Sequence, residues 1–278
     1  TARKYNRVTQ TGAKSRSRKP FHDAAEFVRN NGLGKLDRIE VEIPPNNRFC
    51  GATWKPEPVP AGLDWDMWLG PAPWRPYTSI GCHYNFRFIE ENACGQVTNF
   101  GAHGLDIAQW ALDMDNSGPV EVEGHGEFPS SGLFTNATKV DFTVRYASGI
   151  PMHCRTYYDA GGATVRFVGE RGWLHIARDR VNASDNNLLR EMQAPNKPIQ
   201  LTPSNNHHEN FFACVRSRQR AISDVEAGHR SATVCNLGHI AMMLDRKLRW
   251  DPAKEEFVGD DMANRLRSRA MRAPWSLA

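Results

Sequence analysis

The sequence predicts an α+β fold with a large, mostly antiparallel open sheet and flanking helices. Short apolar–polar alternations fill residues 120–176 and are separated by turns, a pattern typical of successive hairpins with one polar face. Apolar residues at helical spacing lie on either side of this run, over Phe21–Asn31 and Ser231–Leu244. A third helix is predicted within Gly95–Leu112.

The N-terminal residues predict the end of a different domain. Thr1–Asn6 is typical of a helix tail, and Arg7–Gly12 of a short strand. The Phe21 helix then ends at Asn31-Gly32, a common helix C-cap, and Leu36–Ile43 alternates as a strand. Helix, strand, helix and strand in succession form an α/β rhythm that starts partway through a domain.

Residues 44–76 form an irregular segment with eight prolines and four tryptophans. A solvated linker seldom carries so many tryptophans. We therefore expect an ordered loop that packs on the domain or lines a cleft. Indole rings suit stacking on sugar rings, although core packing is their commoner use.

The remaining elements follow from the same patterns. The predicted strands are Val140–Tyr146, Ile150–Tyr157, Ala163–Gly169 and Trp173–Ala177. Residues 178–206 are polar and weakly patterned, which predicts a surface excursion. A helix over Asn210–Arg218 is expected to bury Phe211, Phe212 and Val215.

Composition excludes several classes of protein. The chain has 278 residues, 40% hydrophobic and 24% charged, with a net charge of +4, so neither nucleic-acid nor membrane binding is indicated. Its six cysteines include no Cys-x-x-Cys pair. We expect free, mostly buried thiols and neither a metal site nor a disulfide framework.

Gly95–Leu112 carries the main catalytic candidates. His103 falls near the start of the predicted helix, and Asp106 lies three residues later on the same face. An imidazole beside a carboxylate suits proton transfer near neutral pH. A structural histidine followed by an ordinary acidic residue is the alternative.

Several stretches together resemble the glucose–fructose oxidoreductase/inositol dehydrogenase (Gfo/Idh/MocA) family, in its bacterial branch with a distinctive C-terminal domain. The resemblance extends from about Arg3 to Trp275 and depends on the combination of motifs. These are Gly70–Tyr77, Gly95–Leu112, His229–Ala241, Leu248–Pro252 and Met271–Trp275.

The resemblance implies a longer protein that uses NAD or NADP. Family members join a Rossmann domain to an α+β domain and usually transfer hydride between a nicotinamide and a sugar, polyol or related alcohol. On this model residues 1–20 resemble the end of the dinucleotide-binding Rossmann domain, its last strand and helix, and residues 21–278 the C-terminal substrate and oligomerisation domain. Their Gly-x-Gly-x-x-Gly loop and Glu-Lys-Pro motif would precede Thr1, and neither occurs in this sequence; Gly124-His-Gly126 is the nearest imitation. We therefore expect this chain alone not to bind the cofactor.

The resemblance also implies roles for particular residues. His103 would be the general acid/base, and Asp106 would cap the helix or orient His103. Asn99 stands where the family pattern has Asp; an amide cannot carry a proton but can hydrogen-bond a sugar hydroxyl or the cofactor. Lys14 and Arg16 resemble the loop that reaches the cofactor and substrate.

Substrate contacts are predicted in two further places. Trp74 and Arg75 would wall the cleft or contact a neighbouring subunit. His207 and His208 lie at the start of the helix predicted over Asn210–Arg218. One of them could face the substrate cleft, and a surface role is the equally open alternative. By analogy with the family, the open sheet is expected to pair with a second copy of the chain.

Three functions remain open on the sequence. The first is the substrate-binding, acid/base part of an oxidoreductase acting on a sugar, polyol or glycoside hydroxyl. The second is a glycoside-cleaving or isomerising enzyme in which NAD is used transiently. The third is an inactive truncated domain. A cytoplasmic location is expected, or a periplasmic one if a leader precedes Thr1.

Overall fold

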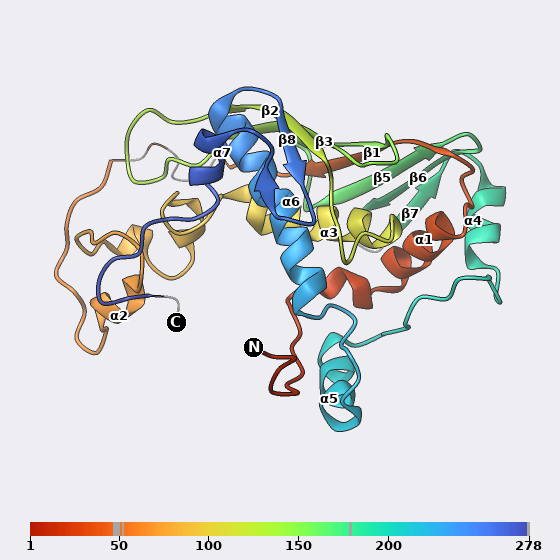
Figure 1. The fold of residues 1–278 in the computed structure, drawn as a ribbon, viewed down its shortest axis with the longest axis horizontal. Helices are drawn as coiled ribbons and strands as arrows, with labels where there is room; N and C mark the ends of the chain where they lie inside the picture. The colour runs from red at the N-terminus through yellow and green to blue at the C-terminus, as the bar shows by residue number, and fades with distance from the viewer. Residues whose placement is uncertain (47–50, 52, 178–179, 277–278) are drawn as a thin grey trace.

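The fold is a nine-stranded sheet with its principal helices packed against one face (Figure 1). The computed structural model describes residues 1–46, 51, 53–177 and 180–276. Strand order is β7-β6-β5-β1-β4-β3-β2-β8-β9. Every pairing is antiparallel except that of β1 with β4, so the predicted mostly antiparallel open sheet is confirmed.

The strands and helices have the following bounds. The strands are β1 Leu36–Ile43, β2 Glu121–Glu127, β3 Lys139–Arg145, β4 Pro151–Thr156, β5 Thr164–Gly169, β6 Gly172–Ala177, β7 Arg180–Ala183, β8 Leu248–Asp251 and β9 Glu256–Phe257. The helices are α1 Lys19–Arg29, α2 Trp65–Leu69, α3 Ala102–Ala111, α4 Asn186–Gln193, α5 His207–Ser217, α6 Val225–Leu244 and α7 Asp261–Arg265. None of the helices in the described ranges is long and apolar enough to cross a bilayer.

The two faces of the sheet differ in polarity, as the alternation predicts. Toward the helices β1 buries Ile39, Val41 and Ile43 completely. The other face carries charged side chains that pair across neighbouring strands, such as Arg155 with Glu42 at 2.7 Å. One face of each strand therefore enters the core and the other remains polar.

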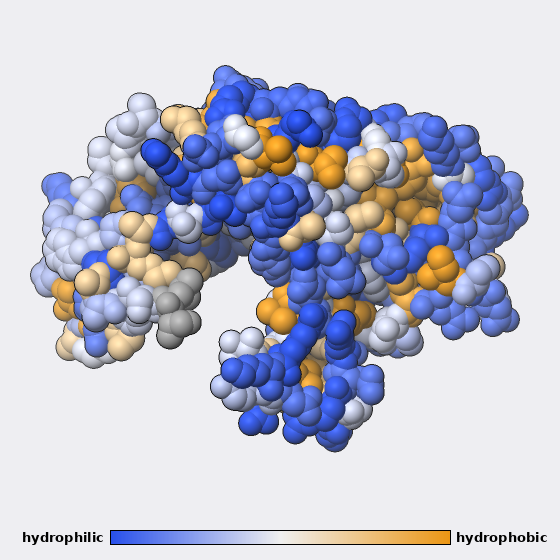
Figure 2. Space-filling view, viewed as in Figure 1, coloured by the Kyte–Doolittle hydropathy of each residue, from blue (hydrophilic) through white to orange (hydrophobic). Residues whose placement is uncertain are grey.

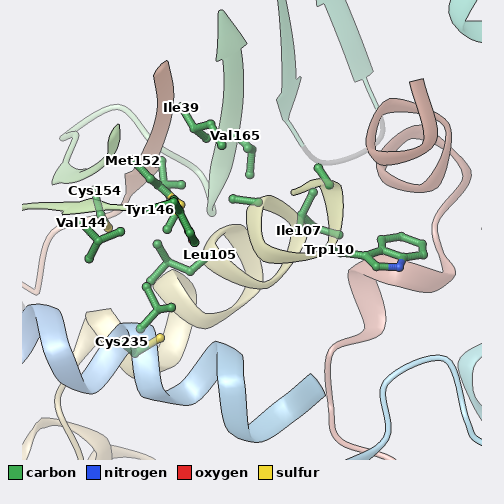
Figure 3. Close-up of a cluster of buried hydrophobic side chains, with 14 of the residues drawn as sticks. Ile39, Leu105, Ile107, Trp110, Val144, Tyr146, Met152, Cys154, Val165 and Cys235 are labelled. Carbon is green, nitrogen blue, oxygen red and sulfur yellow. The ribbon is translucent and has the colours of Figure 1, made fainter. Parts of the chain in front are cut away.

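α3 and α6 approach the sheet closely because glycines face it. A Cβ on Gly104 would lie 2.6 Å from Cγ1 of Val41, and one on Gly238 would lie 2.5 Å from the Phe142 ring. Figure 3 shows side chains of α3, the strands and α6 meeting in one apolar cluster. A side chain larger than hydrogen at either glycine would push a helix away from the sheet.

Residues 53–94, which we call the tryptophan lobe, form an ordered segment beside the sheet (Figure 1). Trp65 and Trp68 stack with their ring centroids 4.8 Å apart, and Trp65 contacts Tyr77 edge-on. Arg272 joins the C-terminal segment to the lobe through Asp66 at 2.6 Å and the Gly70 carbonyl at 2.9 Å. The expectation of an ordered loop is confirmed for residues 53–76; residues 47–50 and 52 of the predicted segment lie outside the described residues.

The two predictions for residues 1–12 have different outcomes. Thr1–Asn6 ends as a helix tail does: the Asn6 and Arg7 amides donate to the Arg3 and Ala2 carbonyls at 3.1 and 2.8 Å, and Asn6 has a φ of +48°. The strand predicted over Arg7–Gly12 is not formed. The Thr11 amide donates to the Ser223 carbonyl at 2.8 Å. Because this segment pairs with a loop and not with a sheet edge, its backbone has no strand ladder to join, and the predicted Rossmann remnant is not confirmed.

Two predictions for the C-terminal half also need correction. Residues 180–193 contain β7 and α4 within the expected irregular excursion, of which residues 178–179 lie outside the described part of the chain. In α5 only Cys214 is buried, and Phe212 is 55% exposed. α5 stands apart from the sheet (Figure 1), so the described residues offer its apolar face no core to enter.

The close packing of α6 gives a stability prediction. In Gly238→Ala the new methyl overlaps the buried Phe142 ring, which should cost about 2 kcal/mol. Alanine stabilises a helix by roughly 1 kcal/mol over glycine. The free energy of unfolding measured in urea should therefore fall by about 1 kcal/mol net.

Gly118→Ala is the matched control, because its methyl would meet only Pro252 at 4.0 Å. We expect a change within about 0.5 kcal/mol there. An unchanged or higher stability of Gly238→Ala would show that α6 does not pack this closely.

Candidate functional site

α3 begins from a widened turn that positions His103. Val97–Gly101 adopts π-helical geometry and runs directly into α3, placing His103 in the first α-helical turn. Gly95, immediately upstream, has a φ of +61°, and a Cβ there would lie 2.9 Å from Asn136. Single π turns often mark functional sites within helices.

A cleft of about 390 Å3 opens at this helix start. Its walls come from residues 11–13, from Phe86 and Arg87 in the tryptophan lobe, from the region 98–106, and from residues 228–232 of α6. Of the predicted site residues, it brings together His103, Asn99 and Asp106. Arg87 and Ser231 also line the cleft and were not among the residues predicted from the sequence, although Ser231 lies within the His229–Ala241 motif.

The environment of His103 favours a neutral imidazole. Burial is the main cause that lowers its pKa, and the cations Lys14 and Arg18 lower it further. Asp106 acts in the opposite direction and only partly compensates. No hydrogen bond reaches the His103 side chain from the part of the chain that the structure describes. The ring is therefore neutral at pH 7 and able to accept a proton.

Asn99 is held by its amide group at the same cleft. Its Nδ2 donates to Oε1 of Gln96 at 2.9 Å, and Gln96 donates in turn to the Pro45 carbonyl at 3.1 Å. The remaining acceptor capacity of the Asn99 amide oxygen can serve a ligand hydroxyl.

Asp106 and Arg16 form a buried ion pair. Nε and Nη2 of Arg16 donate to the two carboxylate oxygens at 2.9 and 2.7 Å, and Ser231 donates to Oδ1 at 2.8 Å. Arg16 is fully buried and also contacts Asp115 at 2.7 Å. Asp106 therefore does not cap α3, and Arg16 has no exposed surface with which to touch a cofactor.

Lys14 remains exposed on the turn Lys14–Ser17, just beyond the wall formed by residues 11–13. Its charge reaches His103, since it contributes to the lowered pKa of that ring. The two basic residues predicted to act alike thus differ. Lys14 faces solvent near the cleft, whereas Arg16 is buried and attaches its segment to α3 through Asp106.

His207 supports the cleft from outside. Its Nε2 lies 2.9 Å from the Thr11 carbonyl and must donate to it, so Nδ1 accepts from the Ser17 hydroxyl at 2.9 Å. His208 is exposed at the start of α5. Neither histidine lines the cleft that contains His103.

Trp74 and Arg75 lie in the tryptophan lobe, away from His103. Trp74 is 62% exposed. Arg75 donates to Asn92 at 3.0 Å and lies over the rings of Trp65 and Trp68. Neither lines the His103 cleft.

A dinucleotide phosphate site is not formed by the nearest glycine pair. Gly124 and Gly126 lie inside β2, and a Cβ on Gly124 would lie 2.5 Å from Cβ of Phe142. These glycines therefore serve sheet packing. Among the described residues there is also no group of three or more His, Cys, Asp or Glu that could hold a metal ion.

The Arg16–Asp106 pair gives a second stability prediction. Arg16→Met should cost roughly 3–5 kcal/mol of unfolding free energy, because it leaves the buried Asp106 carboxylate without its cation. Arg145→Met, which removes an exposed partner of Glu121, should cost about 1 kcal/mol or less. Equal losses in urea unfolding of the two variants would contradict the structural role of Arg16.

Solved structures of similar fold cover most of this chain. Aldose–aldose oxidoreductase from Caulobacter crescentus, complexed with glycerol, is 15% identical with a TM-score of 0.58, over 89% of this chain and 65% of that one. WlbA dehydrogenase from Bordetella pertussis, in complex with NADH and UDP-GlcNAcA, is 12% identical with a TM-score of 0.58, over 90% and 65%. A putative myo-inositol dehydrogenase from Sinorhizobium meliloti 1021 is 11% identical with a TM-score of 0.55, over 89% and 67%.

These likenesses establish the fold, and the chain spans 65% of the length of the first and second structures. A search of curated proteins gives no match. The family described as "Oxidoreductase family, C-terminal alpha/beta domain" matches residues 48–277, most of the chain. The chain therefore belongs to the Gfo/Idh/MocA oxidoreductase family and carries its C-terminal α/β domain.

Proposed function

We propose that this chain is the substrate-binding and acid/base part of a nicotinamide-dependent oxidoreductase that acts on a sugar, polyol or glycoside hydroxyl. The observation that carries the proposal is the His103 imidazole, which lines a cleft of about 390 Å3 with a lowered pKa. Membership of an oxidoreductase family supports it, as do relatives whose structures hold NADH with a sugar nucleotide, or glycerol.

The residues of this chain do not fit a whole dinucleotide. The sequence has no Gly-x-Gly-x-x-Gly loop, and backbone N–H groups of such a loop normally bind the pyrophosphate. A bound nicotinamide would supply the hydride acceptor. We therefore assign to this chain only the groups that bind the alcohol and move its proton.

His103 accepts the hydroxyl proton of the substrate. The neutral ring has a free lone pair for this proton, and the reverse reaction returns the proton to the carbonyl oxygen. Asn99 is proposed to hold a neighbouring hydroxyl through its amide oxygen. Lys14 is proposed to contact the cofactor or substrate at the open side of the cleft, where its charge also keeps His103 neutral.

Asp106 and Arg16 act as positioning residues. Their ion pair fastens residues 11–17 to α3 and α6, which fixes two walls of the cleft around His103. His207 holds the same segment through Thr11 and Ser17.

The remaining predicted contacts lie outside the cleft. Trp74, Arg75 and His208 are proposed to meet a neighbouring subunit or a more distant part of the ligand. The polar face of the open sheet is proposed to pair with a second copy of the chain.

Replacing the proposed base should reduce turnover. His103→Asn, assayed in the complete gene product with NAD or NADP and a panel of sugars and polyols, should lower kcat by roughly 10²–10⁴ with KM little changed. The amide keeps a polar side chain in the cleft but cannot carry the proton. Counting NADH formed per product separates net oxidation from transient use of the cofactor.

His125→Asn is the matched control, because His125 lies on β2 at the sheet, paired with Asp245. Its turnover should equal that of the unaltered protein. A loss of tenfold or less in His103→Asn would refute the acid/base role.

The charge of Lys14 should set the titration of His103. Lys14→Met should raise the His103 pKa, because removing a nearby cation makes the imidazolium less costly. The acidic limb of the pH–rate profile should move to higher pH, since His103 must be neutral to accept a proton. NMR titration of the imidazole measures the shift.

Lys139→Met removes a cation that pairs with Glu127 and does not line the cleft. It should leave the His103 pKa unchanged. An unaltered or lower pKa in Lys14→Met would show that Lys14 exerts no effect on the ring.

A further inference from the structure

A larger groove adjoins the His103 cleft. It has a volume of about 930 Å3 and lies between the tryptophan lobe, α6 and the C-terminal residues 266–271; Figure 2 shows the molecule hollowed beside the lobe. Ala93, Thr98 and Ala232 line both spaces, so the groove and the cleft adjoin at these residues. The cleft lies near the lower end of the usual range for ligand pockets and the groove near the upper end.

His239 is a polar group in this groove that the proposed function does not use. It projects from α6, is 3% exposed and packs edge-on against Phe128 at 6.0 Å. Neither Nδ1 nor Nε2 has a hydrogen-bond partner among the described residues. Because buried polar atoms are nearly always paired, this imidazole lacks a partner that a ligand would provide.

The protonation state of His239 indicates what that ligand carries. Burial, with a smaller effect from Arg269, lowers the pKa of His239 to about 4. At pH 7 one ring nitrogen therefore donates and the other accepts. A hydroxyl group can do both, whereas a carboxylate or phosphate only accepts, so hydroxyls satisfy both nitrogens.

The other groove residues match an uncharged, hydroxylated ring. Asn236 adds an exposed amide one turn from His239 on α6. Glu91 and Arg269 give the groove both signs of charge, so no ionic ligand is favoured. Pro71 and Pro73 supply apolar surface on the opposite wall, which suits the C–H faces of a sugar.

We propose that the groove binds a second, uncharged glycosyl unit of a substrate whose reacting hydroxyl lies at His103. The substrate class is then a glycoside or disaccharide and not a free monosaccharide. This inference rests on the proposed function, because it takes His103 as the reacting end of the ligand.

Histidine resonances test the proposal, with His103 reporting on the cleft and His239 on the groove. The 278-residue chain, labelled with 15N in its histidines, is titrated separately with cellobiose, maltose and glucose. We expect at least one disaccharide to shift both resonances and glucose to shift that of His103 alone.

Each other outcome overturns the proposal in a distinguishable way. If every sugar shifts His103 alone, the groove assignment fails and the proposed function stands. Glucose shifting His239 as strongly as a disaccharide also refutes a second subsite, and a shift of His239 alone places the sugar away from His103. If no sugar shifts either resonance, the groove assignment fails, and the proposed function is decided separately by the turnover of His103→Asn.

Variants on α6 provide the quantitative test. His239→Leu should raise the dissociation constant of the disaccharide, read from His103, by about fivefold or more and leave that of glucose unchanged. Asn236→Ala, at an exposed position that folding tolerates, should weaken only the disaccharide in the same way. His125→Leu, outside the groove, should change neither constant; equal constants in all four proteins would overturn the proposal.

Discussion

The ion pair between Arg16 and Asp106 is the interaction on which the candidate site depends. It joins three segments that are far apart in the sequence, because Arg16 follows the N-terminal segment, Asp106 lies on α3 and Ser231 on α6 donates to the same carboxylate. Two buried charges are stable only when each is paired with good geometry. The pair therefore fixes residues 11–13 against the start of α3, and the cleft around His103 exists because those parts cannot move apart without exposing a buried charge.

The same arrangement explains why His103 and Asp106 differ in character although they are one helical turn apart. Asp106 is 1% exposed, and its carboxylate accepts hydrogen bonds from Arg16 and Ser231. His103 faces the cleft, where burial and the cations Lys14 and Arg18 oppose its protonation. Because the Asp106 carboxylate is already paired with Arg16, it only partly offsets the lowering of the His103 pKa by Lys14 and Arg18. The result is a neutral imidazole one helical turn from a buried, ion-paired carboxylate. His239, on the groove side of α6, is neutral for a related reason, since burial dominates its lowered pKa.

α6 links the core to both hollows. Its inner side approaches the sheet at Gly238, and its other residues line the cleft through Ser231 and the groove through Asn236 and His239. The tryptophan lobe supplies the facing wall and is held to the C-terminal segment by Arg272. A helix between a packed sheet and two adjoining pockets positions side chains more accurately than loops would.

Local sequence determined the strands between residues 36 and 177, the three main helices, the polar and apolar faces of the sheet and the candidacy of His103, because periodicity and turn residues act over a few positions. It did not predict β7, β8 or β9. Only the tertiary structure decided which groups meet. It buried Arg16 against Asp106, left Phe212 exposed on α5, removed the strand expected at residues 7–12, and placed His239 unpaired in a groove. Such outcomes depend on partners far away in the chain; Arg16 and Asp106, for example, are 90 residues apart. Charge pairing and the covering of apolar faces across such a separation leave no local pattern in the sequence.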